Sequence, residues 1–348
     1  MGLYRIIVVM LTLLNAVLLY ADDNPRGKLH GYAFGDIYYK MVGDDARASP
    51  SQYATMAQGM NGVQFRRLNL YYDINISEDF FTRIIIEGND ETLTGENTTV
   101  FIREAYLQWR NIIPRHDILV GILPTPTWSI GYPERIWSYR SVEKTITEFR
   151  ELGVPTDFGV AVHGSIDSGG TVQYVGMIGS GRTLLFNDNA YKNYYFMLQV
   201  EPWPGIMMEG YVDRWMGGDG FHTSTYKLFA AYRNDKLTIG SEILYQVQEH
   251  ASLFERHREV LGLSLFIHGP VLENIRAFGR YDFYDPDRNV VGSGYRESFF
   301  VLGLDYRPFP DIQVMPNIWL NTFSPKSRAV EGKDTDIVFR ISLLYSFQ

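Results

Sequence analysis

The sequence predicts an all-β protein, a transmembrane antiparallel β-barrel of about sixteen strands whose long third loop folds inward and carries a short helix. Three observations predict this fold. The chain begins like an exported protein, apolar and polar residues then alternate along about sixteen segments, and the connections between these segments are alternately short and long. Alternation with a period of two is the sequence signature of a strand with one apolar face.

The first 21 residues have the pattern of a secretory signal peptide. Arg5 precedes the apolar run Ile6–Leu19, and Ala21 is a small residue just before the polar chain. A charged start, a short apolar core and a small residue at the cleavage site are typical of such peptides. The run is shorter than the roughly 20 apolar residues that a membrane-spanning helix needs. We therefore predict a signal peptide over residues 1–21 and a barrel over residues 22–348, with an uncleaved anchor as the alternative.

Composition and charge exclude several classes of protein. The net charge is −8, whereas a nucleic-acid partner requires a basic face that neutralises phosphates. The chain has no cysteine, which excludes a disulfide scaffold and a thiolate metal site. We predict no nucleic-acid partner, no cofactor and no metal site, although His250, Glu255 and His257 near one loop are the alternative for a metal.

The alternation is clearest in the last segment of the chain, because successive side chains of a strand point to opposite faces. Its apolar face would consist of Ile337, Phe339, Ile341, Leu343, Tyr345 and Phe347. Its other face would consist of Val338, Arg340, Ser342, Leu344 and Ser346. One face therefore suits lipid, and the other is largely polar.

The same reading gives about sixteen segments, each long enough for a tilted strand to cross a bilayer. They begin near residues 28, 63, 80, 101, 116, 156, 171, 191, 206, 222, 236, 258, 274, 296, 312 and 335. The segments near Val172 and Met208 alternate least well. A soluble β-sandwich or β-helix is the alternative, since soluble sheets also alternate. A closed barrel in lipid needs no apolar core for its outer face and has no unpaired edge.

A barrel of this size is too wide for side chains from its wall to fill, so its polar face would line water. The lumen residues that alternation predicts include Arg67, Arg83, Glu104, Arg276, Arg280 and Arg340. So many charges would be costly in a dry core, and a solvated lumen accounts for them more simply.

The longest connection, at about residues 124–155, has an apolar side that does not suit a solvated outer loop. Val142, Ile146 and Phe149 would share one face of a helix over Ser141–Glu151. We expect the loop to lie inside the barrel, with this face on the wall and a charged face narrowing the pore. The predicted constriction residues of the loop are Arg140, Glu143, Lys144, Glu148 and Arg150. The alternative is an outer helix that caps the barrel or contacts a neighbouring protomer.

Two stretches of this region, Gly121–Pro126 and Trp137–Thr145, resemble the phosphate-selective porin O and P group and related porin-like proteins. The opening Phe34–Tyr39 is also similar. The resemblance implies a passive channel in the outer membrane of a Gram-negative bacterium, in contact with lipid and lipopolysaccharide and often a homotrimer. Phosphate-selective members have lysine-rich constrictions, whereas this loop has only Lys144. Many such chains end on an aromatic residue, but here Gln348 comes last.

The leading functional prediction is a porin for small hydrophilic solutes, with a mild anion preference. Arg340, Arg67 and Arg83 would form one wall, and the loop would stand off from it, so that arginines face the passage. The alternatives are a transporter of hydrophobic substrates and a barrel-borne hydrolase. We predict no enzyme, because no spacing of Ser, His and Asp selects a catalytic set.

Overall fold

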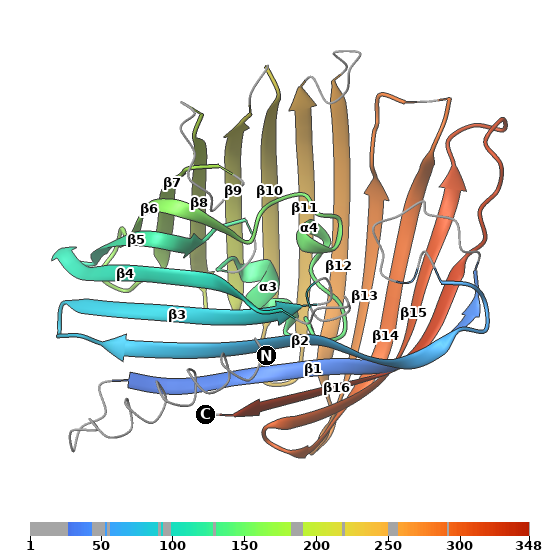
Figure 1. Cartoon of the computed structure of the whole chain (residues 1–348), viewed down its shortest axis with the longest axis horizontal. Coiled ribbons are helices and arrows are strands. Elements are labelled where there is room, and N and C mark those ends of the chain that lie inside the picture. Colours follow the sequence, from blue (N-terminus) through green and yellow to red (C-terminus); the bar gives the residue numbers. More distant parts are fainter. Residues whose placement is uncertain are drawn as a thin grey trace, which may run out of the picture.

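The structure is a computed structural model that describes residues 27–43, 53, 56–89, 92, 99–127, 130–181, 191–217, 220–249, 257–290 and 292–347. Sixteen antiparallel strands pair in chain order and close between the first and the last (Figure 1). The predicted barrel and its strand number are confirmed. The predicted signal peptide at residues 1–21 lies outside the described residues.

The strands follow the segments that the sequence predicts, and each begins within two residues of its predicted start. They are β1 (Gly27–Val42), β2 (Asn61–Asn75), β3 (Phe80–Asn89), β4 (Phe101–Ile113), β5 (His116–Pro124), β6 (Thr156–Ser165), β7 (Val172–Gly179), β8 (Asn193–Trp203), β9 (Ile206–Met216), β10 (His222–Arg233), β11 (Thr238–Glu249), β12 (Arg258–Leu272), β13 (Ile275–Asp285), β14 (Tyr295–Phe309), β15 (Ile312–Pro325) and β16 (Asp336–Phe347). Two short helices, α3 (Tyr132–Trp137) and α4 (Ile146–Phe149), lie between β5 and β6. No helix among the described residues is long and apolar enough to span a membrane.

The two ends of the barrel differ in the length of their connections. At one end, which we call the short-turn end, β2 connects to β3 through residues 76–79 and β8 to β9 through residues 204–205. At the long-loop end, β1 connects to β2 through residues 43–60 and β5 to β6 through residues 125–155. Gly31 pairs with Phe347, so β1 begins and β16 ends at the short-turn end, as an even strand number requires.

Side-chain exposure follows the predicted alternation. On β16, Leu343 is 42% exposed on the outer face, whereas the neighbouring Ser342 is fully buried inside. The outer face is apolar on every side of the barrel, as on β11 and β12, where Ile243 and Leu265 are exposed. An apolar outer band of this kind is what a barrel in lipid presents.

Two of the β-bulges that interrupt the alternation each place an additional arginine in the lumen. Phe34 pairs with Arg67 and Gly35 pairs with Phe65, so that Arg66 is an extra residue on β2. Ile85 pairs with Glu104 and Ile86 with Ile102, so that Arg103 is extra on β4. A bulge lets two consecutive residues face the same side.

The consequence is two consecutive charged pairs on the inner face, Arg66–Arg67 and Arg103–Glu104, all four of them buried. Strict alternation predicts only Arg67 and Glu104 there. The one signal in the sequence for the other two is the presence of adjacent charges in an otherwise apolar strand.

Candidate functional site

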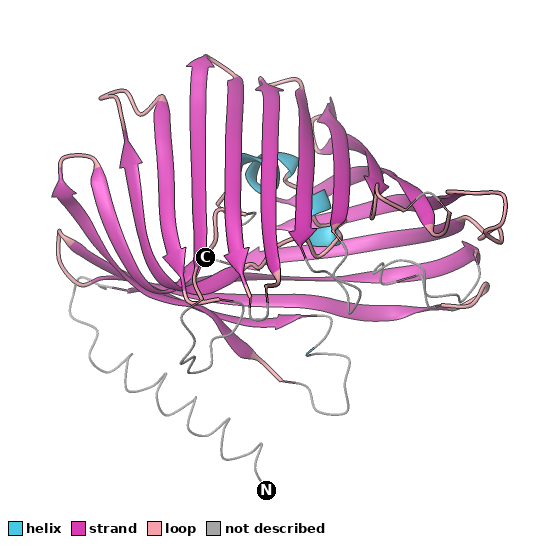
Figure 2. Cartoon of the chain, turned by 90° about the horizontal axis from the view of Figure 1, so that it is seen from above, coloured by secondary structure: helices cyan, strands magenta, loops and turns pink. Residues whose placement is uncertain are grey.

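The connection between β5 and β6 lies inside the barrel, as predicted (Figure 2). Helix α3 contacts β9, β10 and β11, and α4 contacts β12. The expected helix over Ser141–Glu151 is wrong in extent, because α4 covers only four of these residues. Helix α3 was not predicted, although a proline in the first turn, here Pro133, is typical of a helix start. Between the helices, the amides of Val142 and Glu143 donate to the carbonyl of Tyr139, which forms a turn.

The apolar side of this loop packs on the wall and forms a hydrophobic core within the lumen. The loop contributes Trp137, Tyr139, Val142 and Phe149, all buried. The wall contributes Phe229, Phe266, Phe278, Phe299, Met315, Trp319 and Val338, from β10, β12–β16. This sector of the lumen is therefore filled by side chains.

Polar contacts fix the loop around the circumference of the barrel. Arg66 on β2 donates to the carbonyls of Ser141 and Val142 at 3.1 and 3.2 Å. Across the lumen, Arg150 pairs with Glu297 on β14 at 2.6 Å, a contact buried on both sides. Since buried ion pairs break only at a high cost, these contacts hold the loop in one position.

The loop does not stand off from the wall of β16, β1 and β2, contrary to the expectation from the sequence. Arg340 lies 3.8 Å from Glu143, and Arg67 lies 3.6 Å from Glu148. No row of arginines therefore faces the loop across open water here. The physical reason is that the loop carries carboxylates opposite these arginines, and direct ion pairing draws the two surfaces together.

Several predicted lumen residues are accordingly occupied by structural contacts. Arg280 donates to Asp282 and to the carbonyl of Lys144, both at 2.5 Å. Arg276 is half-buried near the short-turn end, opposite Asp305 on β14. Lys144 itself keeps part of its side chain exposed, 4.0 Å from Glu148.

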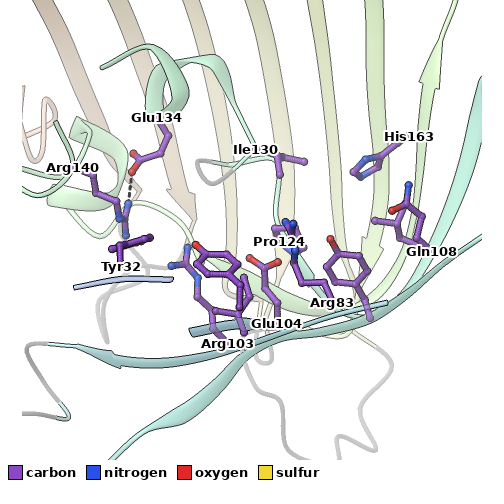
Figure 3. A pocket seen from close by; sticks show the side chains of 14 residues that line it. Tyr32, Arg83, Arg103, Glu104, Gln108, Pro124, Ile130, Glu134, Arg140 and His163 are labelled. Atoms are coloured by element: carbon purple, nitrogen blue, oxygen red, sulfur yellow. Dashed lines mark hydrogen bonds and ion pairs between the residues drawn. The ribbon is translucent and has the colours of Figure 1, made fainter. Parts of the chain in front are cut away.

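The open part of the lumen lies on the other side of the loop, against β2–β8. A first cavity has a volume of about 300 Å³, and Figure 3 shows side chains that line it. Its charged lining residues are Arg83, Arg103, Glu104, Glu134 and Arg140. A second cavity, of about 320 Å³, shares Ile130 and His163 with the first. Its charged lining residues are Arg115, Asp117 and Arg135. The two cavities together have five arginines and three carboxylates, a formal excess of two positive charges.

An ion-pair network connects the wall to the loop beside the first cavity. We call its members Arg67, Glu87, Arg103, Arg140 and Glu148 the wall–loop network. Glu87 accepts from Arg103 at 2.6 Å and lies 3.5 Å from Arg67, which in turn faces Glu148. Arg140 pairs with Glu148 and, at 2.5 Å, with Glu134 (Figure 3). These contacts limit the width of the first cavity because they fix the distance between β2–β4 and the loop.

Glu148 is ionised within this network. Burial by itself would raise the pKa of its carboxyl, but the charges of Arg140, Arg67 and Lys144 outweigh that effect and lower the pKa below its usual range. A carboxyl whose pKa is lower in the folded state stabilises the fold at every pH above its unfolded pKa, about 4.3. That contribution is lost as the pH falls through the lower folded-state value.

The loop should therefore loosen only in acid. We expect the free energy of unfolding that the wild type has in excess of the Glu148→Gln variant to stay constant from about pH 7 down to about pH 4.3 and to shrink below it. The variant should be less stable at neutral pH, since Arg140 and Arg67 each lose one of their charged partners. Denaturant unfolding at several pH values measures this difference, and equal stability of the two proteins at neutral pH would show that this carboxylate does not hold the loop.

No three His, Asp or Glu side chains among the described residues lie close enough together to hold a metal ion. His250 and Glu255, which the sequence offers as metal ligands with His257, lie outside the described residues. The described part of the lumen thus offers arginines, carboxylates and tyrosines to a solute, and this chemistry suits recognition by charge and hydrogen bonding.

Solved structures of high overall similarity are bacterial outer-membrane proteins. An anion-selective porin from Comamonas acidovorans has a TM-score of 0.68 at 11% identity, covering 92% of this chain and 99% of that one. The outer membrane channel DcaP of Acinetobacter baumannii also has a TM-score of 0.68, at 15% identity, covering 92% and 97%. The chain has the porin fold. OmpF of Salmonella typhi, in complex with daunomycin, is also similar in fold. Its TM-score is 0.64 at 12% identity, covering 92% of this chain and 97% of that one.

No family model and no curated protein matches the sequence. At identities of 11–15%, the likeness to these porins is one of fold.

Proposed function

We propose that this protein is an outer-membrane porin, a water-filled channel through which small hydrophilic solutes and ions diffuse passively, with a mild preference for anions. The observation that carries the proposal is the lining of the two cavities, five arginines against three carboxylates. Arginine rows along a pore favour anions. The acidic net charge of −8 does not oppose this, since charges on outer loops are screened over about 8–10 Å.

The passage runs between the loop and β2–β8 in this proposal. Arg103, Arg140 and Arg135 then replace Arg340 and Arg280 as the residues nearest to a permeating ion. Arg83 and Glu104 belong to the proposed pore lining as well, and their place in the lining of the first cavity supports this.

The proposal also covers location and partners. The signal-like residues 1–21 and the apolar outer face support export to the outer membrane of a Gram-negative bacterium, where lipid and lipopolysaccharide would surround the barrel. The anion-selective porin among the similar structures supports the anion preference only by analogy. We extend the analogy to a homotrimer. A hydrophobic-substrate transporter fits the charged cavities less well, and no catalytic residue or cofactor is part of the proposal.

Reversal potentials in a KCl gradient test this function on the purified barrel in planar bilayers. The wild type should be weakly anion-selective. Combining Arg103→Gln with Arg140→Gln removes the formal excess of two positive charges, so the reversal potential should move to or beyond zero in the cationic direction. The matched control combines Arg233→Gln with Lys236→Gln, two exposed residues at the short-turn end, and should keep most of the selectivity.

Two outcomes would contradict the proposal. A wild-type barrel that carries no current is not a channel. A double Arg103/Arg140 variant that keeps its anion preference would move the selective step away from the first cavity.

A further inference from the structure

One carboxylate in the first cavity has no partner. Glu104 is only 5% exposed, and its side chain points from β4 into the cavity between Arg83 and Arg103 (Figure 3). Among the described residues, Glu104 makes no hydrogen bond or ion pair, although Arg83 and Arg103 line the same cavity. A buried, ionised carboxylate is costly when nothing donates to it. Its position is therefore informative about what enters the cavity.

The arginines around Glu104 are already engaged with other carboxylates. Arg83 donates through Nε and Nη2 to Asp73, both at 2.7 Å. Arg103 donates through Nη1 to Glu87 at 2.6 Å. The charge of Glu104 is thus the one carboxylate charge in this cavity that no direct contact within the described residues balances.

The same arginines still have donors to offer. A guanidinium has five N–H groups, and the hydrogen bonds of Arg83 to Asp73 and of Arg103 to Glu87 use only some of them. Both side chains line the cavity together with Glu104. An acceptor for one charged group and donors for another therefore lie within one volume of about 300 Å³, at the small end of the range for ligand sites.

We propose that the first cavity is a binding station for small zwitterions, molecules with both an ammonium and a carboxylate group, such as α-amino acids. The ammonium group would donate to Glu104, and the carboxylate would accept from free N–H groups of Arg83 and Arg103. This inference rests on the proposed channel function and names the class of solute that the channel favours over a simple anion. Charge-assisted hydrogen bonds at both ends of the solute supply the preference.

An ammonium group suits Glu104 better than a hydroxyl group does. Both can donate a hydrogen bond, but only the ammonium group also neutralises a buried carboxylate. A monoanion of the same size would accept hydrogen bonds from the arginines, but the charge of Glu104 would repel it. The site thus distinguishes three solutes with one carbon skeleton, namely propionate, lactate and alanine.

The experiment measures how strongly each of these three solutes blocks KCl current through the purified full-length barrel. For the wild type we expect alanine to block at about tenfold lower concentration than propionate or lactate. In Glu104→Gln, which keeps the shape and removes the charge, this advantage should fall to about twofold or less. Glu104→Asp keeps the charge and should keep the advantage of alanine. This variant is the second test if the Glu104→Gln protein folds poorly. Glu273→Gln removes the same charge from an exposed turn and should change nothing.

The outcomes separate this inference from the channel function. If lactate blocks as well as alanine, Glu104 binds a hydroxyl group as well as an ammonium group, or it is protonated. In either case the zwitterion proposal is wrong. If alanine keeps its advantage in Glu104→Gln, the proposal is also wrong. In both cases KCl current shows that the channel still conducts, whereas a wild type without current would overturn the channel itself.

Discussion

Replacing Trp319 with alanine is expected to lower the free energy of unfolding by about 3–5 kcal/mol, the range for truncating a large buried aromatic residue. Trp319 on β15 is fully buried, and its ring packs against Phe299, Phe149 and Tyr53 with centroids 5.2, 6.3 and 5.3 Å away. Its indole N–H donates to a carboxylate oxygen of Glu143 at 2.8 Å. The substitution opens a cavity and also removes a donor from a buried carboxylate.

The same change should alter conduction, because Trp319 joins the wall to the loop. With Phe149 and Glu143 released, the loop should fluctuate, and we expect a larger and noisier single-channel current. Denaturant unfolding in lipid vesicles and bilayer recording check the two effects. Trp319→Phe keeps most of the packing and loses only the hydrogen bond, so its cost should be nearer to about 1 kcal/mol.

Trp203→Ala provides the matched control for the loss of an indole. Trp203 is 67% exposed at the short-turn end of β8 and is not part of the hydrophobic core that holds the loop. The Trp203→Ala substitution should leave the unitary current unchanged. A Trp319→Ala barrel with wild-type current and stability would mean that the hydrophobic core in the lumen does not position the loop.

The strands could be predicted from the sequence because one physical rule determines them. A wall between lipid and lumen requires alternation, and this held even on β7 and β9, where the pattern is weak. The inward loop was also predictable, since Val142, Ile146 and Phe149 form an apolar side that has no place in an outer loop.

The route of the passage could not be predicted in the same way. Alternation assigns a residue to a face, but it does not say which part of that face the loop covers. Arg340 and Arg280 do face inward, yet the loop packs on them, whereas Arg83 and Glu104 remain at an open cavity. That difference depends on long-range contacts such as Arg150 with Glu297, which are 147 residues apart in the chain.

The β-bulges are a second reason why the lining of the lumen could not be predicted in full from the sequence. Counting by twos places Arg66 and Arg103 in lipid, where an arginine near the midplane costs about 2–4 kcal/mol. The register shifts at Phe34/Gly35 and Ile85/Ile86 turn both side chains inward. The sequence could have indicated this by exclusion, since an adjacent pair of charges on a membrane strand is tolerated only if both point into the lumen.

Placing arginine at Leu107 should destabilise the barrel by about 2–4 kcal/mol if this residue lies near the bilayer midplane. Leu107 is the middle residue of β4 and is 43% exposed on the outer face. Its neighbour Gln108 faces inward, lines the first cavity and donates to Asp117 at 2.7 Å. Gln108→Arg keeps a donor for Asp117 and places the new charge in water, so it should cost much less.

This adjacent pair is a stricter test of the two faces than a pair on β16. Ser342 on β16 faces inward but is fully buried and accepts from Asn317, so an arginine there would collide with packed side chains. At Gln108 the cavity leaves room, and only the environment of the charge differs from that at Leu107. Unfolding by denaturant in phospholipid vesicles measures both costs. Similar losses for Leu107→Arg and Gln108→Arg would mean that the outer face of β4 does not lie in lipid, because the two variants differ only in the face that carries the charge.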